Sequence, residues 1–361
     1  MKHRKLRLLM LGPALTVKGG VTAVEKLILP ALPSYIEASH VATMSDGSKL
    51  TKLLRYLWAL PVAIVNFFSA DIVHIHFASR ASSMRKKVLA ELALFFGRPV
   101  VMHAHGAEYH LYWKEMTEAQ RRHKLSLFKR IDALIVLGAS WKTFFTSIGV
   151  PEEKITVLPN PVALPAQIPS RQAGAQAQFV YLGIMDYRKG AFDLVDAVAS
   201  LPPEVRSAVR VVVAGNGEVA RMRETVKAKG LESVITVRDW LNVQQRDQLL
   251  AESDVFVLPS YNEGLPMAML EAMAWGLPPL CTPVGSIPEY VTSNGNGVMV
   301  QPGDVPALAN AITQLAMNGA ERVRMGQAAR KTIEPLNLHD YIEKLCRVYD
   351  GIAGEASRQS A

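Results

Sequence analysis

The stretch that decides the fold runs Asp254-Val255-Phe256-Val257-Leu258-Pro259-Ser260-Tyr261-Asn262-Glu263-Gly264-Leu265-Pro266 and continues as Met267-Ala268-Met269-Leu270-Glu271-Ala272-Met273-Ala274-Trp275-Gly276. Its first part is a short apolar run, typical of a buried strand, and Pro259 ends it. Pro266 suits the first position of a helix, and good helix formers follow as far as Gly276. A strand, a turn and a helix start in succession predict an anion site, because free backbone N–H groups and the helix dipole point at one place.

Two glutamates, Glu263 and Glu271, stand on either side of this helix start. Glu271 would lie roughly 7–8 Å along the axis from the helix start, at ~1.5 Å per residue. That length matches the step from a diphosphate to a sugar diol, and one carboxylate can accept hydrogen bonds from two hydroxyls. The pattern predicts a nucleotide sugar as ligand. The alternative is that each glutamate is a solvated residue on an amphipathic helix, as a single Glu usually is.

This stretch resembles the E-x7-E signature of the retaining glycosyltransferases of family 4, which have the GT-B fold. In that family the first glutamate lies beside the transferred sugar and the second holds the ribose. The resemblance implies these roles for Glu263 and Glu271, with the amides of Gly264, Leu265 and Pro266 between them. It also implies an α/β fold of two doubly wound, Rossmann-like domains that face an interdomain cleft.

Length and composition agree with a two-domain globular chain. The chain has 361 residues, with 49% hydrophobic and 20% charged residues, so each domain can bury its own core. Cys281 and Cys346 offer no disulfide framework, which indicates a reducing compartment. The apolar run after the basic N-terminus is broken by Gly12-Pro13, so we expect a first strand there and no signal peptide. With no apolar stretch of ~20 residues, we expect a cytoplasmic protein, soluble or peripheral on the inner face of the membrane.

Charge is shared unevenly between the two halves. Residues 1–165 hold 22 Lys+Arg and 11 Asp+Glu, a balance of +11, whereas 166–361 hold 18 and 21, a balance of −3, and the two add to the total of +8. The excess predicts an anionic partner, and no helix-turn-helix, zinc-finger or aromatic single-strand signature supports nucleic acid. Residues 49–68 combine basic side chains with a broad apolar face that carries Trp58, as an interfacial helix does. An ordinary core helix with a solvated basic face explains the same pattern, and both interpretations stay open.

Short apolar strands alternate with helical stretches, the pattern of parallel α/β sheets. The expected strands are 6–11, 72–76, 100–103, 133–137, 156–158, 179–182, 209–214, 235–237, 255–258, 280–282 and 298–300. Residues 160–178 are rich in Pro, Ala and Gln without periodicity and are predicted to be a linker. We therefore expect an acceptor-binding domain over 1–165 and a donor-binding domain over 166–337. A final helix within 338–361 resembles the one that crosses back to the first domain in the family.

Two further segments resemble donor-binding parts of the family. Gly19 and Gly20 follow the first strand, like Gly-Gly loops that touch the donor's phosphates, and glycine lets backbone approach a ligand closely. The alternative is a plain strand-to-helix turn. Lys189 matches the lysine of the family's G-R-L-x-x-x-K-G motif, which clamps the diphosphate, but Ile184 replaces its arginine. Arg188 is a candidate for the missing charge, although neighbours on a regular element point in different directions.

The nucleotide is expected along the next strand ends of the second domain. Gly215 and Gly217 form a Gly-x-Gly turn after a strand, at the sheet edge where ligands usually bind. Trp240 and Leu241 lie in a segment that resembles the one meeting the nucleobase edge, and Trp240 suits stacking as well as packing. The glycines of the first loop do not form G-x-G-x-x-G, which argues against a dinucleotide enzyme.

His105 resembles the family histidine that contacts the sugar at the reaction centre. His-x-His pairs at 74–76 and 103–105 each place two imidazoles on one face of a strand, and imidazole is a good zinc ligand. Nearby carboxylates and thiols show no ligand spacing, so we expect no metal, and the lack of Asp-x-Asp argues against a metal-dependent GT-A enzyme. Glu108 is a candidate for orienting or deprotonating the acceptor hydroxyl.

Together these features predict a retaining, metal-independent glycosyltransferase with no cofactor, whose substrate is a UDP- or GDP-linked sugar. The resemblance extends to bacterial polysaccharide-assembly enzymes, which implies a lipid-linked glycan acceptor for exopolysaccharide, capsule or lipopolysaccharide. The departing phosphate assists same-face attack in the family's proposed mechanism, so no protein nucleophile is expected. Two alternatives remain: a GT-B sugar-nucleotide 2-epimerase, and a non-catalytic nucleotide-sugar-binding membrane adaptor.

Overall fold

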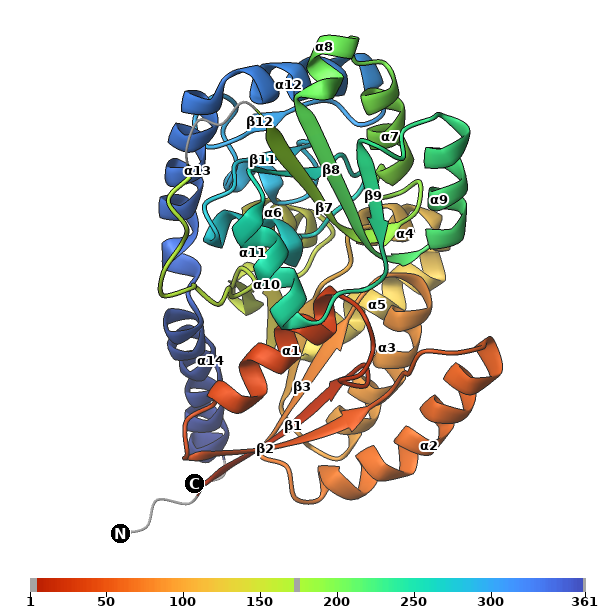
Figure 1. Cartoon of the computed structure of the whole chain (residues 1–361). Helices are drawn as coiled ribbons and strands as arrows, with labels where there is room; N and C mark the ends of the chain where they lie inside the picture. The colour runs from red at the N-terminus through yellow and green to blue at the C-terminus, as the bar shows by residue number, and fades with distance from the viewer. Residues whose placement is uncertain (1–4, 172–175, 360–361) are drawn as a thin grey trace. The chain divides into compact units, whose positions relative to one another are not determined.

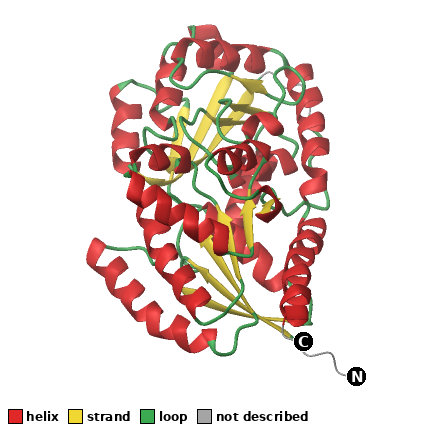
Figure 2. Cartoon of the chain, turned by 180° about the vertical axis from the view of Figure 1, so that it is seen from behind, coloured by secondary structure: helices red, strands yellow, loops and turns green. Residues whose placement is uncertain are grey.

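A computed structural model describes residues 5–171 and 176–359, with side chains as far as residue 354. The chain divides into two compact units (Figure 1): Met1–Pro161 with Leu338–Ala361, and Val162–Asn337. Each unit is a parallel sheet with helices on both faces (Figure 2). The expected α/β fold of two Rossmann-like domains, the GT-B fold, is confirmed.

The first unit contains a six-stranded parallel sheet in the order β2-β1-β3-β4-β5-β6. Its strands are β1 (Leu6–Gly12), β2 (Ile36–Ala42), β3 (Ile72–Phe77), β4 (Val100–Ala104), β5 (Ala133–Val136) and β6 (Ile155–Val157). Its helices are α1 (Gly20–Ala31), α2 (Lys49–Phe67), α3 (Arg80–Phe95), α4 (Tyr109–Glu115), α5 (Glu118–Arg130), α6 (Ala139–Ser147), a 3-10 turn (Glu152–Lys154) and α14 (Leu338–Gln359). The central strands are buried along their whole length, which explains their continuous apolar runs. The strand order reverses between β1 and β3, where ligands bind in such sheets.

The second unit contains six parallel strands in the order β12-β11-β10-β7-β8-β9. Its strands are β7 (Ala177–Met185), β8 (Val209–Gly217), β9 (Ile235–Arg238), β10 (Val255–Leu258), β11 (Pro279–Cys281) and β12 (Val298–Met299). Its helices are α7 (Ala191–Ala199), α8 (Pro203–Ser207), α9 (Val219–Ala228), α10 (Val243–Glu252), α11 (Met267–Ala274), α12 (Val305–Met317) and α13 (Gly319–Ile333), with 3-10 turns at Ile287–Glu289 and Glu334–Leu336. The order reverses between β7 and β10, so the carboxyl ends of these two strands mark the expected ligand edge.

The segment predicted as a linker is anchored at two points of its described part. Val162 forms a β-bridge with Asn337, so the second unit begins before residue 166. Arg171 donates to the carbonyls of Leu250, Ser253 and Trp275. Residues 172–175 of the predicted linker lie outside the described part of the chain. The composition of residues 160–178 lacks periodic apolar residues and therefore did not predict these backbone contacts.

The last helix, α14, belongs to the first unit. It packs against α1, and its buried Tyr349 lies with its hydroxyl 2.5 Å from Nδ1 of His74 on β3. A second contact joins the hydroxyl of Tyr35 to Asp350. These contacts bring the end of the chain back onto the sheet formed by its beginning.

Among the described helices, only α2 has the length and apolar composition needed to cross a membrane. Its buried side chains are Ala59, Ala63 and Phe67, which form the stripe that holds it to the first unit. Leu60, Val62 and Ile64 are half-buried. Six other large apolar side chains are exposed: Leu50, Leu53, Leu54, Leu57, Trp58 and Val65. Lys49 and Lys52 lie in the first turn of the helix. With basic residues, a buried stripe and exposed apolar side chains, α2 is an amphipathic surface helix with an uncovered apolar face.

Candidate functional site

A lysine and a glutamate meet at the switch point of the second unit. Lys189 follows β7 and Glu263 follows β10, and their Nζ and Oε1 atoms are 2.5 Å apart. Both side chains are largely removed from solvent, with 16% of Lys189 and 5% of Glu263 exposed. Ser260 donates from Oγ to the same carboxylate oxygen at 2.8 Å. Two residues predicted from separate motifs therefore form one buried ion pair at the ligand edge.

The turn that carries Glu263 is supported by the loop after β11. Thr282 donates to Ser260 O at 2.5 Å, and the Ser286 amide donates to Gly264 O at 2.8 Å. Gly285 has φ +58°, and a Cβ there would lie 2.1 Å from Glu263 O, so only glycine fits. These supporting residues were missed in the sequence. The sequence feature that could have indicated them is the Thr-Pro-Val-Gly-Ser run of residues 282–286, which follows the next strand at its carboxyl end.

The helix after this turn begins one residue later than predicted. Pro266 is the residue before α11, with an extended ψ of 121°, and Met267 is the first helical residue. The helix ends as predicted: Gly276, at φ +74°, donates to Met273 O, and the next amide donates to Ala272 O. This pair of bonds is a Schellman motif, which satisfies the last carbonyls of the helix.

Glu271, one turn into α11, has an arginine partner that the sequence reasoning missed. Nη1 of Arg246 on α10 lies 2.5 Å from Oε1 of Glu271, and the same guanidinium also bonds Asp247. Burial raises the pKa of Glu271 to about 7, while Arg246 opposes the shift and Asp247 adds to it. Arg246 lies in a polar helix without a motif, so only the fold brings it to this carboxylate.

Arg188 points to the same turn as Lys189. Its Nη1 donates to Asn262 O at 3.2 Å, and its own carbonyl accepts from the Tyr261 amide. Ile184, at the expected arginine position, lies at the end of β7 opposite Asn216 in the β7–β8 register. Its Cγ2 would lie 2.8 Å from a Cβ added at Gly217, so the isoleucine packs against the Gly-x-Gly turn.

The Gly-x-Gly turn has a structural requirement of its own. Gly215 has φ +156°, and an added Cβ would lie 1.8 Å from Gly183 O of β7; Gly217 has φ +95°. The glycines are thus needed for close pairing of β7 with β8. Trp240 and Leu241 lie between β9 and α10, with 41% of Trp240 exposed and Leu241 partly buried.

In the first unit, the two predicted glycines stand at the start of α1. Gly19 precedes the helix with an extended backbone, and Gly20 is its first residue. Both lie after β1, on one side of the switch point of this sheet. No described atom lies within 4 Å of a Cβ added at Gly19, so neither packing nor φ explains this glycine.

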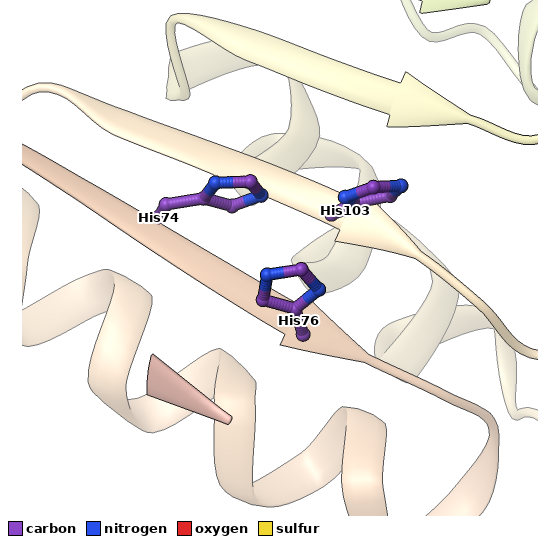
Figure 3. A group of neighbouring side chains, drawn as sticks. All are labelled: His74, His76 and His103. Atoms are coloured by element: carbon purple, nitrogen blue, oxygen red, sulfur yellow. The ribbon is translucent and has the colours of Figure 1, made fainter. Parts of the chain in front are cut away.

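Four histidines lie on one face of β3 and β4 or just beyond them: His74, His76, His103 and His105 (Figure 3 shows the first three). Nε2 of His105 is 2.9 Å from Nδ1 of His76, and its ring centroid lies 4.1 Å from that of His103, with the two rings tilted by 32°. Burial lowers the pKa of His105 to about 3, which keeps the imidazole neutral. Glu108, a candidate for the acceptor proton, forms an ion pair with Arg80.

Comparisons with known proteins decide the family. The model of glycosyl transferases group 1 matches residues 167–332, and that of glycosyltransferase family 4 matches residues 24–164. The chain is a family 4 glycosyltransferase.

Individual relatives of this family 4 glycosyltransferase agree in sequence and fold. It is 27% identical over 340 residues to the amylovoran biosynthesis glycosyltransferase AmsK of Erwinia amylovora, covering 91% of this chain and 81% of AmsK. Its fold matches Anabaena HepE, solved with UDP and glucose, at a TM-score of 0.77 and 17% identity, covering 96% of this chain and all of HepE. It also matches sucrose-phosphate synthase from Thermosynechococcus elongatus at a TM-score of 0.79 and 17% identity, covering 97% and 100% of the two chains.

Proposed function

We propose that this family 4 glycosyltransferase moves a sugar, with retention of anomeric configuration, from a UDP- or GDP-linked donor to a hydroxyl acceptor. The Lys189–Glu263 pair at the switch point of the second unit carries this proposal. It places a cation and a carboxylate where open α/β sheets bind ligands. The crystal structure of HepE with UDP and glucose supports a nucleotide-sugar donor.

The leaving group is the donor's diphosphate, and Lys189 is the residue assigned to its charge. Its ammonium pairs with Glu263, and donor binding would exchange this carboxylate partner for phosphate oxygens. The bond between the anomeric carbon and the phosphate oxygen breaks, and its electron pair stays on the phosphate. A fixed ammonium stabilises that charge as it develops, without reorganisation of solvent. Arg188, on the same turn, is the candidate for a second positive charge.

Glu263, released from Lys189, then faces the transferred sugar. The acceptor oxygen bonds to the anomeric carbon on the face that the phosphate leaves, and the hydroxyl proton passes to the departing phosphate. No protein nucleophile and no donor-bound metal take part in this scheme. The neutral ring of His105 is assigned to a sugar contact, since an uncharged imidazole can accept or donate one hydrogen bond.

Glu271 is assigned to the ribose. Arg246 fixes one of its oxygens, Oε1, and thereby orients the carboxyl group for two neighbouring hydroxyls. Trp240, with its exposed ring after β9, is assigned to stacking on the base. Gly19 and Gly20 are assigned to close approach of backbone to the donor's phosphates.

The acceptor is proposed to be a lipid-linked glycan in bacterial polysaccharide assembly. AmsK, a relative over most of the chain, is named for amylovoran biosynthesis. The exposed apolar face of α2, beside Lys49, Lys52 and Arg55, fits the interface of an anionic bilayer, where such an acceptor is anchored. The exposed Phe68 and Phe95, which both contact Phe96, extend this apolar surface toward α3.

A sedimentation assay with anionic phosphatidylglycerol vesicles tests the membrane part. Trp58→Glu should release the protein from the vesicles, because it puts a negative charge in the apolar face. Met317→Glu, at another exposed apolar residue, in the second unit, is the matched control and should bind like the unaltered chain. Equal binding of both variants would contradict the assignment of α2.

The reaction itself is tested by nuclear magnetic resonance of products from a panel of UDP- and GDP-sugars with a simple alkyl-glycoside acceptor. The proposal predicts a new glycosidic bond with the donor's anomeric configuration. Conversion of the donor alone to a 2-epimer would favour the epimerase alternative. Donor binding with no product in any combination would favour the adaptor.

A further inference from the structure

The histidine cluster of the first unit contains buried nitrogen atoms that have no protein partner. His74, His76 and His103 are 0%, 1% and 0% exposed. Among the described residues, Nε2 of His74, Nε2 of His76 and both ring nitrogens of His103 have no hydrogen-bond partner. A buried polar atom without a partner costs about 1–3 kcal/mol. Several such nitrogen atoms in one place therefore require an explanation.

The three rings also converge on one point. His74 and His76 alternate along β3, so they face the same side of the sheet, and His103 stands opposite His76 in the β3–β4 register. One nitrogen of each ring lies within 4.8 Å of the other two. Figure 3 shows the rings gathered on one face of the two strands.

A buried carboxylate stands beside this cluster. Glu25 of α1 is 0% exposed, and its Oε1 is 4.0 Å from Nε2 of His76. Neither of its oxygens has a hydrogen-bond partner within the described residues, although Nε2 of His40 lies 3.4 Å from Oε2. The buried ammonium of Lys86 donates to Leu11 O.

We propose that His74, His76 and His103 bind one divalent zinc ion, with Glu25 as the fourth ligand. Imidazole and carboxylate groups are both zinc donors, and one ion would satisfy one unpartnered nitrogen of each ring together with an oxygen of Glu25. Zn–N bonds of ~2.0–2.1 Å in a tetrahedron put ligand nitrogens roughly 3.3 Å apart. From separations of up to 4.8 Å, each nitrogen must therefore move inward by at most roughly 0.8 Å.

The outer contacts of the rings suit metal binding. Nδ1 of His74 meets the Tyr349 hydroxyl at 2.5 Å, and Nδ1 of His76 meets Nε2 of His105 at 2.9 Å. Such partners fix the ring orientation and leave Nε2 as the ligand atom. Burial also holds the pKa of these imidazoles well below the usual value, so they are in the neutral form that binds metals.

The ion has a structural role that is separate from the proposed donor chemistry of the second unit. It would join α1, through Glu25, to the sheet strands β3 and β4, and His74 links the same centre to α14 through Tyr349. We therefore expect zinc to stabilise the first unit.

The test uses the full chain after removal of metals with a chelator, titrated with Zn²⁺ by calorimetry and with Co²⁺ by absorption spectroscopy. The proposal predicts one ion per chain, a tetrahedral cobalt spectrum and a raised unfolding temperature with Zn²⁺. His103→Gln should weaken binding at least 100-fold. His123→Gln, at an exposed histidine on α5, is the control and should bind like the unaltered chain.

A measurement on the unaltered chain covers the case in which His103→Gln does not fold. X-ray absorption at the zinc edge should show only nitrogen and oxygen ligands, at ~2.0–2.2 Å. Sulfur ligands, or the absence of a stoichiometric ion after titration, would overturn the proposal. So would unchanged zinc affinity in a folded His103→Gln variant.

Discussion

The Lys189–Glu263 ion pair predicts that substitutions of its two residues have non-additive effects on the free energy of unfolding. Replacing Lys189 with Met leaves the Glu263 carboxylate, 5% exposed, with Ser260 as its remaining donor. Removing one partner of a buried pair costs about 3–5 kcal/mol, and we expect the lower end because Lys189 keeps 16% exposure. Glu263→Gln leaves the ammonium with more solvent and should cost about 2 kcal/mol. The double variant should lose less than the sum, which gives a coupling of about 2 kcal/mol.

Hydrogen exchange measured by mass spectrometry suits this double-mutant cycle of Lys189→Met and Glu263→Gln, because a two-unit chain need not unfold in one transition. The peptides to follow cover β10 and α11, next to the pair. The matched control is the exposed pair Lys229–Asp196 of the same unit, with Nζ and Oδ1 3.0 Å apart, which should couple by less than about 1 kcal/mol. Additive effects of Lys189→Met and Glu263→Gln would refute the reasoning.

Three further predictions concern other parts of the second unit and α14. Burial raises the pKa of Glu271 in the folded chain from 4.5 to about 7, so folding favours the protonated carboxyl group. The free energy of unfolding should therefore fall by at most about 3 kcal/mol as the pH rises from 4.5 to 7. Urea unfolding of Glu271→Gln should lack this pH dependence, and an unchanged pH dependence would contradict the prediction. Gly215→Ala should destabilise by more than about 2 kcal/mol, since the new Cβ meets Gly183 O, whereas Gly351→Ala in α14 should stabilise by up to about 1 kcal/mol; thermal unfolding that ranks them the other way would refute both. Arg246→Met should weaken UDP-sugar binding about tenfold in calorimetry while Arg223→Met, at an exposed ion pair, should not; equal affinities would show that Arg246 does not orient Glu271.

Most of the fold was predictable because buried parallel strands are continuous apolar runs. The expected strands correspond to described ones within a few residues, but β2 was missed. Its sequence, Ile-Glu-Ala-Ser-His-Val-Ala, is exposed through its middle at the edge of the sheet, so neither an apolar run nor regular alternation marks it.

The candidate site was predictable only where residues belong to a motif. Lys189 and Glu263 were predicted from separate segments, and the structure places them in contact. Arg246 was missed because it lies on a polar helix and acquires its role from a partner on another helix. The histidine cluster was assigned no metal because its carboxylate, Glu25, lies far away in the sequence and reaches the rings only through the packing of α1.

The most direct test of the central claim is a calorimetric titration of the unaltered chain and of Lys189→Met with UDP, GDP and their glucose and mannose conjugates. Hydrogen exchange shows first whether the variant is folded. We predict that one nucleotide series binds the unaltered chain, and that Lys189→Met weakens that series by at least tenfold. Equal affinity of a folded Lys189→Met variant for the same nucleotide sugar would contradict the assignment of the donor diphosphate to Lys189.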